Sequence, residues 1–307
     1  MVPELDCPLH ADPSVRAKYP AVLSEKPSRK YKAVADYLTD NKLKVNDDKT
    51  HLLVMTTRQK RRFVDTNSVQ IETPTATISP STVEQLLGGQ VHQDMRWVDH
   101  ILESDKSLVK GLNQRIGALK KVSTMASFKT RKTIANGIFM SKLIYLMPLW
   151  SGCEDYLVKC LQVAQNKAAR TVARMNIFTP TKTLMKACGW MSVRQLMAYH
   201  SLVLLHKTLT HQSPLYLYNK ITASGSFSYK TRQAASCPPG FSFRVCHPTD
   251  NGAVRQESGA KLGISKQGWC WKSVELYNTL PDDLRLERKL PNFNKRLKEW
   301  ILLNVKT

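Results

Sequence analysis

Two adjacent carboxylates, Asp47 and Asp48, are the residues whose types and spacing most directly suggest chemistry. They precede the apolar run from Thr50 to Thr57. Paired carboxylates can hold divalent metal ions, which activate a hydroxyl and stabilise the leaving group in phosphoryl transfer. The same residues, with Asn46 before them, are also good turn formers. Neighbouring elements and partner groups must therefore decide between a metal site and a turn.

Other residue types that bind metals form no site with recognisable spacing. The nearest cluster consists of Cys237, Cys246, His247 and Cys270. Its gaps match no zinc motif, so a zinc site remains only an alternative there. The seven cysteines are scattered and odd in number, which indicates free thiols in a reducing compartment. We predict that His100, His200 and His206 are packing residues, because no nucleophile or acid is placed beside them.

The charge of the chain indicates a polyanionic partner. Lys and Arg number 46 against 24 Asp and Glu, a formal net charge of +22. From Lys106 to Arg244 there are 21 basic residues and only two acids, Glu154 and Asp155. Apolar stripes run through this stretch, so we interpret it as a folded basic surface and not as a charged tail.

Basic residues at four places are predicted to contact nucleic acid. They are Lys49; Arg58, Lys60, Arg61 and Arg62; Lys120, Lys121, Lys129, Arg131 and Lys132; and Lys159, Lys167, Arg170 and Arg174. The last four are expected opposite the apolar face Leu157, Leu161, Ala164, Ala168 and Val172 of one helix. The cluster at 58–62 has two alternatives, a nuclear-import signal or a solvated loop. For Lys159, Lys167, Arg170 and Arg174, the alternative is an ordinary solvated helix face.

Hydropathy predicts neither a membrane span nor a secretory signal. The most apolar window, Ile134 to Trp150, contains Lys142 and is shorter than the roughly 20 residues that a bilayer requires. The N-terminus has no basic segment followed by an apolar one. We therefore expect a protein of the nucleus or cytoplasm that is not secreted and contacts no membrane.

Periodicity predicts an α+β fold at the N-terminal side followed by a mostly α-helical part. A helix is expected from Ser28 to about Asn41, and strands at 50–57, 69–78 and 86–91. Helices are expected near 95–122, 127–147, 154–175, 181–188, 192–209 and 291–303. The predicted domains are 1–28, a poorly ordered leader; 29–92, a helix with short strands; 93–222, helical; 223–267, an irregular loop region; and 268–307, a C-terminal helical element.

Short motifs occur in an order that resembles one family of enzymes. They are Asn41, Leu43, Asn46, Lys49 and Thr50; Leu87 and Gly88; Trp97, His100 and Ile101; Tyr145 and Trp150; Gln165, Asn166, Ala168, Ala169 and Arg170; Asn278, Leu280 and Pro281; and Phe293, Lys295 and Leu297. The series resembles the distal palm, thumb and C-terminal extension of reverse transcriptases of non-LTR retrotransposons, of the jockey and X-element type. Tyr277 stands where that family usually has Trp.

The resemblance implies a truncated RNA-directed DNA polymerase with nucleic acid, RNA or an RNA/DNA hybrid, as its partner. The family's catalytic Asp residues, which hold Mg²⁺ in the full-length enzyme, belong to elements before the first of these motifs. Asp47 and Asp48 follow that position, so we interpret them as turn formers and name no catalytic residue. We expect no cofactor, metal or small-molecule substrate for this chain, and no polymerase activity from it alone. Two alternatives remain: a host-retained RNA- or DNA-binding protein, and an incomplete record of an active reverse transcriptase.

Overall fold

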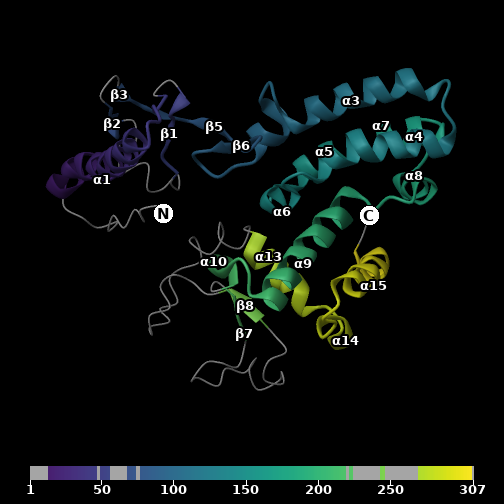
Figure 1. Ribbon diagram of the computed structural model, residues 1–307. Helices are drawn as coiled ribbons and strands as arrows, with labels where there is room; N and C mark the ends of the chain where they lie inside the picture. The colour runs from purple at the N-terminus through teal and green to yellow at the C-terminus, as the bar shows by residue number, and fades with distance from the viewer. Residues whose placement is uncertain are drawn as a thin grey trace. The chain divides into compact units, whose positions relative to one another are not determined.

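In the computed structural model, most of the residues that the structure describes are helical, with a few two-stranded sheets (Figure 1). The described residues are 13–46, 49–55, 68–73, 77–218, 221–223, 243–245 and 269–305. They divide into two compact units, Met1–Ser107 and Leu108–Thr307. Residues 93–107, expected with the helical part, therefore belong to the first unit.

A long helix, α1 (Pro13–Asp40), begins the first unit. The sequence predicted a poorly ordered leader up to residue 28. The structure instead places residues 13–28 in this helix. Proline is compatible with the first turn of a helix, because its missing N–H would have no partner there. Gln70 donates its backbone N–H to Ser24 Oγ at 3.0 Å, which joins α1 to the strand region.

Three pairs of short strands follow α1. β1 (Leu52–Leu53) pairs in parallel with β4 (Pro80–Ser81), and β2 (Ile71–Glu72) pairs antiparallel with β3 (Thr77–Ile78). These strands are shorter than the predicted runs at 50–57 and 69–78, and residues 56–57 and 74–76 of those runs lie outside the described part.

The third strand pair corrects a prediction. β5 (Val83–Leu86) and β6 (Gly89–His92) form a hairpin, so the predicted strand at 86–91 actually crosses a turn. Leu87 and Gly88 both have positive φ, 49° and 80°. A two-residue turn of this kind matches the twist of the strands that it joins, and its glycine has no Cβ to oppose the conformation.

The helix predicted at 95–122 is two separate elements. The π-helix η3 (Asp99–Glu103) ends the first unit, and α3 (Leu108–Ser123) begins the second. Between them the backbone N–H of Lys106 donates to Ser104 Oγ and that of Ser107 to Ser104 O. This local turn replaces helical hydrogen bonds, as serine side chains commonly do.

The second unit begins with three helical segments that lie side by side in Figure 1. They are α3; the continuous run α4 (Phe128–Ala135), η4 (Asn136–Met140) and α5 (Ser141–Ile144); and α7 (Asp155–Ala173). α6 (Met147–Trp150) connects the last two. The predicted apolar face of α7 is confirmed, because its five residues are buried.

Helix α7 is joined to the next elements by two amide side chains. Gln165 donates to the carbonyl of Met191 at 2.9 Å, and Asn166 donates to Thr181 Oγ1 at 2.8 Å. Thr181 begins α8 (Thr181–Cys188), which has the bounds expected from the sequence. Buried Gln165 and half-buried Asn166 therefore serve the packing of α7 against α8 and the chain that follows.

Helix α9 (Val193–His211) is the centre of the C-terminal packing. It contacts α13 (Trp269–Asn278) and α15 (Leu290–Asn304), and α14 (Asp282–Arg285) lies against α15. The buried face of α15 consists of Phe293, Leu297 and Ile301, at the spacing of one helical face. α10 (Leu215–Tyr218) and the strand pair β7 (Ile221–Ala223) and β8 (Phe243–Val245) complete the described part.

The adjacent acids Asp282 and Asp283 follow Pro281, which occupies the N-cap position of α14. Both aspartates lie in the first helical turn, where a negative charge interacts favourably with the helix dipole. Asp282 pairs with Arg285 and Asp283 with Arg296 of α15. Asp283 therefore joins α14 to α15, while the ion pair of Asp282 lies within α14.

His206 of α9 is a packing residue, as its apolar surroundings predicted. Its Nδ1 lies 3.0 Å from the hydroxyl of Tyr277, and its ring stacks on Phe293 with centroids 3.6 Å apart. Burial lowers the pKa of His206 below its ordinary value, an effect that Glu287 opposes and His211 reinforces. Burial also raises the pKa of Tyr277 to about 12, so the phenol stays neutral.

We expect the stability of the second unit to fall as the pH decreases from neutral through about 6.5, the ordinary pKa of histidine. Below about 6.5 the unfolded state binds a proton at His206 that the folded state resists, so protonation favours unfolding. Thermal unfolding at several pH values measures this, and His206→Gln should show a smaller loss over the same interval. An equal loss of stability in the variant and the unaltered protein would exclude His206 as a source of the pH dependence.

Candidate nucleic-acid interface

The candidate interface lies where α3 and α7 both end, and Arg131 holds the two ends together from inside. Arg131 is only 6% exposed. Its Nε donates to the carbonyl of Val172 at 2.8 Å and its Nη1 to the carbonyl of Ala126 at 2.6 Å. Helix C-termini leave carbonyls without partners, and a cation there is favourable. Arg131 was predicted to contact nucleic acid, but the structure buries its side chain and directs its guanidinium to these two carbonyls.

Arg174 makes a similar connection at the surface. It is the C-cap of α7, with a left-handed backbone, and its Nη2 donates to the carbonyls of Ser123 and Thr124 at 2.7 and 3.0 Å. The guanidinium therefore caps the end of α3. Arg174 is nevertheless exposed, so its free N–H groups can still donate to a ligand.

Arg170 is a weaker candidate than the pattern of α7 suggested. Its side chain is half-buried, its Nη2 lies 3.5 Å from the carbonyl of Thr179, and its Nε is buried without a hydrogen-bond partner. It therefore points into the connection between α7 and α8. Lys159 and Lys167, on the same helix, are exposed as expected.

Three exposed lysines flank the connection between α3 and α4. Lys120 and Lys121 lie in the last turn of α3, and Lys129 lies in the first turn of α4. We call these three residues the basic tip. Lys132 is half-buried beside Gly189, where an added Cβ would lie 3.2 Å from its Nζ. Lys132 therefore packs against the end of α8 and is only partly available.

The remaining predicted site residues lie in the first unit. Lys49 is exposed, and its backbone N–H donates to the side chain of Asn46 at 3.1 Å. This bond is typical of a turn. The cluster Arg58, Lys60, Arg61 and Arg62 lies outside the described residues, as do Asp47 and Asp48.

The two acids of the surrounding stretch lie far from the basic tip. Glu154 and Asp155, the two acids of the stretch from Lys106 to Arg244, lie at the start of α7, and Asp155 pairs with Arg194 at 2.9 Å. α7 has 19 residues, so this pair is about 28 Å from the end of the helix. That separation exceeds the Debye length of about 8–10 Å in physiological salt, so the pair does not screen the tip.

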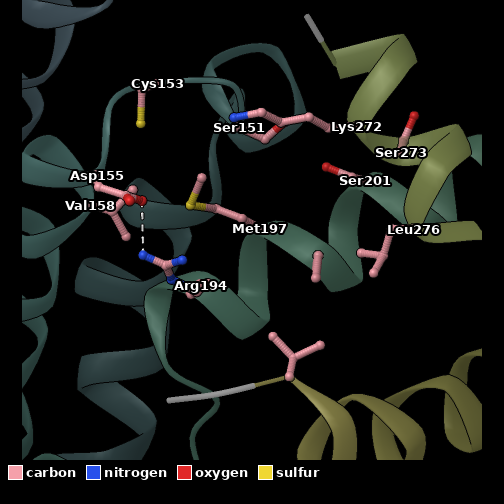
Figure 2. Close-up of a pocket in the computed structure, with 12 residues that line it drawn as sticks. Ser151, Cys153, Asp155, Val158, Arg194, Met197, Ser201, Lys272, Ser273 and Leu276 are labelled. Atoms are coloured by element: carbon pink, nitrogen blue, oxygen red, sulfur yellow. Dashed lines mark hydrogen bonds and ion pairs between the residues drawn. The ribbon is translucent and has the colours of Figure 1, made fainter. Parts of the chain in front are cut away.

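A separate pocket lies between α9, α13 and the start of α7 (Figure 2). Its volume is about 230 Å³, and its apolar side chains include Val158, Met197 and Leu276. Arg194 at its edge is paired with Asp155, as the dashed line in Figure 2 shows. The sequence did not single out this pocket, because its lining comes from helices distant along the chain.

The groups in the pocket are not arranged for catalysis. Burial raises the pKa of Cys153 to about 12, so its thiol is protonated at neutral pH and is a poor nucleophile. No base is placed to activate the hydroxyl of Ser201 among the described lining residues. The pocket therefore provides neither a catalytic pair nor a free cation cluster like the basic tip.

Metal binding is not visible in the described part of the chain. No three His, Cys, Asp or Glu residues are grouped there in a way that could hold an ion. Cys237, Cys246 and His247 of the alternative zinc cluster lie outside the described residues, and so does the side chain of Cys270. Within the described residues, no helix has the length and apolar character needed to cross a membrane.

Comparisons of this chain with protein-family models, with curated proteins and with solved structures find no match.

Proposed function

We propose that this chain is the distal palm, thumb and C-terminal extension of a non-LTR retrotransposon reverse transcriptase, and that it binds RNA or an RNA/DNA hybrid without catalysing polymerisation. The observation that carries the binding proposal is the basic tip: three exposed lysines at the junction of α3 and α4, far from the acids of the same stretch. Exposed lysines of this kind contact phosphates and not base edges, so binding should depend little on sequence.

The residues that resemble the family are well suited to a structural role, which supports the family part of the proposal. Trp150, Leu280, Phe293 and Leu297 are buried, and Gln165 holds the segment before α9. Residues that build a framework can recur in a family while the surface changes. The lysines of the basic tip lie between these motifs, on the framework that the motifs build.

The absence of catalysis is proposed from the chemistry of polymerases. Two Mg²⁺ ions must be held by carboxylates near the primer hydroxyl. In the family that the chain resembles, those carboxylates precede the motif that begins at Asn41, and Asp47 and Asp48 follow it. This chain would then supply the surface that holds the template and primer, while the metal-binding residues belong to another part of a polymerase.

Salt dependence of binding tests the proposal. We expect the purified chain to bind a fluorescent RNA/DNA hybrid of about 20 base pairs at low salt. Its affinity should fall by about 100-fold between 50 and 200 mM salt, which corresponds to roughly four phosphate contacts. Fluorescence anisotropy measures both. Absence of binding at low salt would contradict the proposal, and DNA synthesis by the chain with Mg²⁺ would contradict its catalytic part.

A further inference from the structure

Apolar side chains are exposed at the same end of the second unit as the basic tip. They are Val122, Met125, Phe128, Ile177 and Phe178. Met125 is 96% exposed and Phe178 is 87% exposed. Val122 lies in the last turn of α3 and Phe128 in the first turn of α4, while Met125, Ile177 and Phe178 lie on the connections that follow α3 and α7. Single exposed apolar residues are common on proteins, but a group of five at one end of a helical unit is a mark of a binding surface. We call these five residues the apolar tip.

The two loops of the apolar tip are fixed beside each other. Arg174, the C-cap of α7, donates to the carbonyls of Ser123, the last residue of α3, and of Thr124, which follows it. Arg131 reaches from α4 to the carbonyl of Val172, in the last turn of α7. Figure 1 shows the corresponding elements α3, α4 and α7 running together. The apolar side chains therefore belong to one end of one packed unit.

The loop that carries Phe178 is itself ordered by a turn. The side-chain oxygen of Asn176 accepts from the backbone N–H of Phe178 at 3.4 Å, and its carbonyl accepts from that of Thr179 at 3.1 Å. Phe128 is likewise fixed, because it begins α4 directly after the N-cap Ser127. Both phenyl rings are thus carried by defined backbone, and a ligand would not have to order the loops.

The occupant of this surface must match both its charge and its flat apolar groups. Lys120, Lys121 and Lys129 require negative charge, while Phe128 and Phe178 offer faces on which a planar ring can stack. Unpaired nucleotides carry both, a phosphate and an exposed base, on each unit of the chain. A duplex offers only the phosphates, because its bases are already stacked within the helix.

We infer that the tip of α3, α4 and α7 binds single-stranded nucleic acid, with lysines on the phosphates and with Phe128 and Phe178 stacked on unpaired bases. This inference rests on the proposed nucleic-acid binding and specifies its ligand. It adds that the tip prefers an unpaired strand or overhang to a blunt duplex. The contact is independent of base identity, because every base has a face that can stack.

The test compares two probes of the same sequence, a single strand and a blunt duplex, with the full chain and its variants. Phe128→Ala with Phe178→Ala should weaken binding of the single strand by at least about 10-fold, since each stacked base contributes about 1–3 kcal/mol. Binding of the duplex should change by less than about 2-fold. Both residues are exposed, so the fold should be retained, and circular dichroism checks this.

Two further variants distinguish stacking from simple apolar contact. Phe178→Trp should preserve single-strand binding, and Phe178→Leu should weaken it, because leucine keeps apolar surface but has no ring face. The matched control is Tyr216→Ala with Leu303→Ala, which removes exposed apolar groups elsewhere in the same unit. The control should bind both probes as the unaltered chain does.

The outcomes separate this inference from the proposed function. If the chain binds the duplex and the phenylalanine variants bind the single strand normally, the stacking inference fails and the proposed function stands. If the chain binds neither probe, both fail. Equal losses of affinity for the two probes in the phenylalanine variants would also overturn stacking, and so would unchanged single-strand binding by Phe178→Leu. Binding to phosphatidylserine vesicles that depends on Phe178, without an effect on either oligonucleotide, would assign the tip to a membrane instead.

Discussion

Reversing the charge of the basic tip, by Lys120→Glu, Lys121→Glu and Lys129→Glu together, should lower the affinity for an RNA/DNA hybrid by about 100-fold at low salt. Each reversal replaces an attraction to phosphate by a repulsion of roughly 1 kcal/mol or more in water, and three such changes amount to about 3 kcal/mol. All three side chains are exposed, so the cost to folding should be small. Anisotropy titration measures the affinity.

The control must change the net charge equally at another place. Lys289, Lys295 and Lys298 are exposed at the start of α15 and along it, and their reversal to Glu gives the same net charge. We expect this control to retain most of its affinity. If both triple variants lost affinity equally, binding would depend on the total charge, and the tip would have no special role.

The structure also determines which residues are unsuitable for such a test. Reversal of Lys167, Arg170 and Arg174 follows naturally from the helical wheel of α7. Arg174, however, caps α3, and Arg170 is half-buried near Thr179. Loss of binding in that variant would mix a binding defect with a folding defect. Lys159→Glu with Lys167→Glu tests the exposed face of α7 without this confusion.

Replacing Arg131 by Met should destabilise the second unit by about 3 kcal/mol. The change removes two hydrogen bonds from a charged donor to backbone carbonyls, and bonds of this type contribute about 1.5–3 kcal/mol each. Methionine retains much of the side-chain volume, so the loss reports the hydrogen bonds more than a cavity. Urea denaturation followed by circular dichroism measures the difference in the free energy of unfolding.

Lys129→Met is the matched control for this change. It lies two residues away on the same helix and makes the same change of charge, but its side chain is exposed. Its effect on stability should be within about 0.5 kcal/mol. If Arg131→Met were no more destabilising than Lys129→Met, the hydrogen bonds to Val172 and Ala126 would have no energetic importance. Lys129→Met should lower the affinity for nucleic acid more than Arg131→Met does.

Local patterns were sufficient for the main helices of the second unit. The apolar stripe of α7, the bounds of α8 and the buried face of α15 all follow from a period of 3.6 residues, which neighbouring side chains define without distant contacts. The predicted excess of positive charge also follows from composition alone. These features depend on residues close together in the sequence, and for that reason they could be read from it.

Strands and turns of the first unit were predicted less well. β1 and β4 contain two residues each and pair across 28 positions, so neither is defined by its own residues. Leu87 and Gly88 appeared to continue a strand because leucine is apolar, yet they form the turn between β5 and β6. Short strands exist through their partners, and a pattern within one strand does not reveal the partner.

The same reason explains the assignment of the basic residues. Composition and periodicity established that this chain carries a large excess of positive charge on folded helices, but every Lys and Arg in the pattern was an equal candidate. Only the packed helices separate Arg131, which is turned inward to the carbonyl of Val172, from Lys129, which is turned outward. Burial of this cation depends on an acceptor 41 positions away, the carbonyl of Val172, and the two groups meet only after α4 has packed against α7.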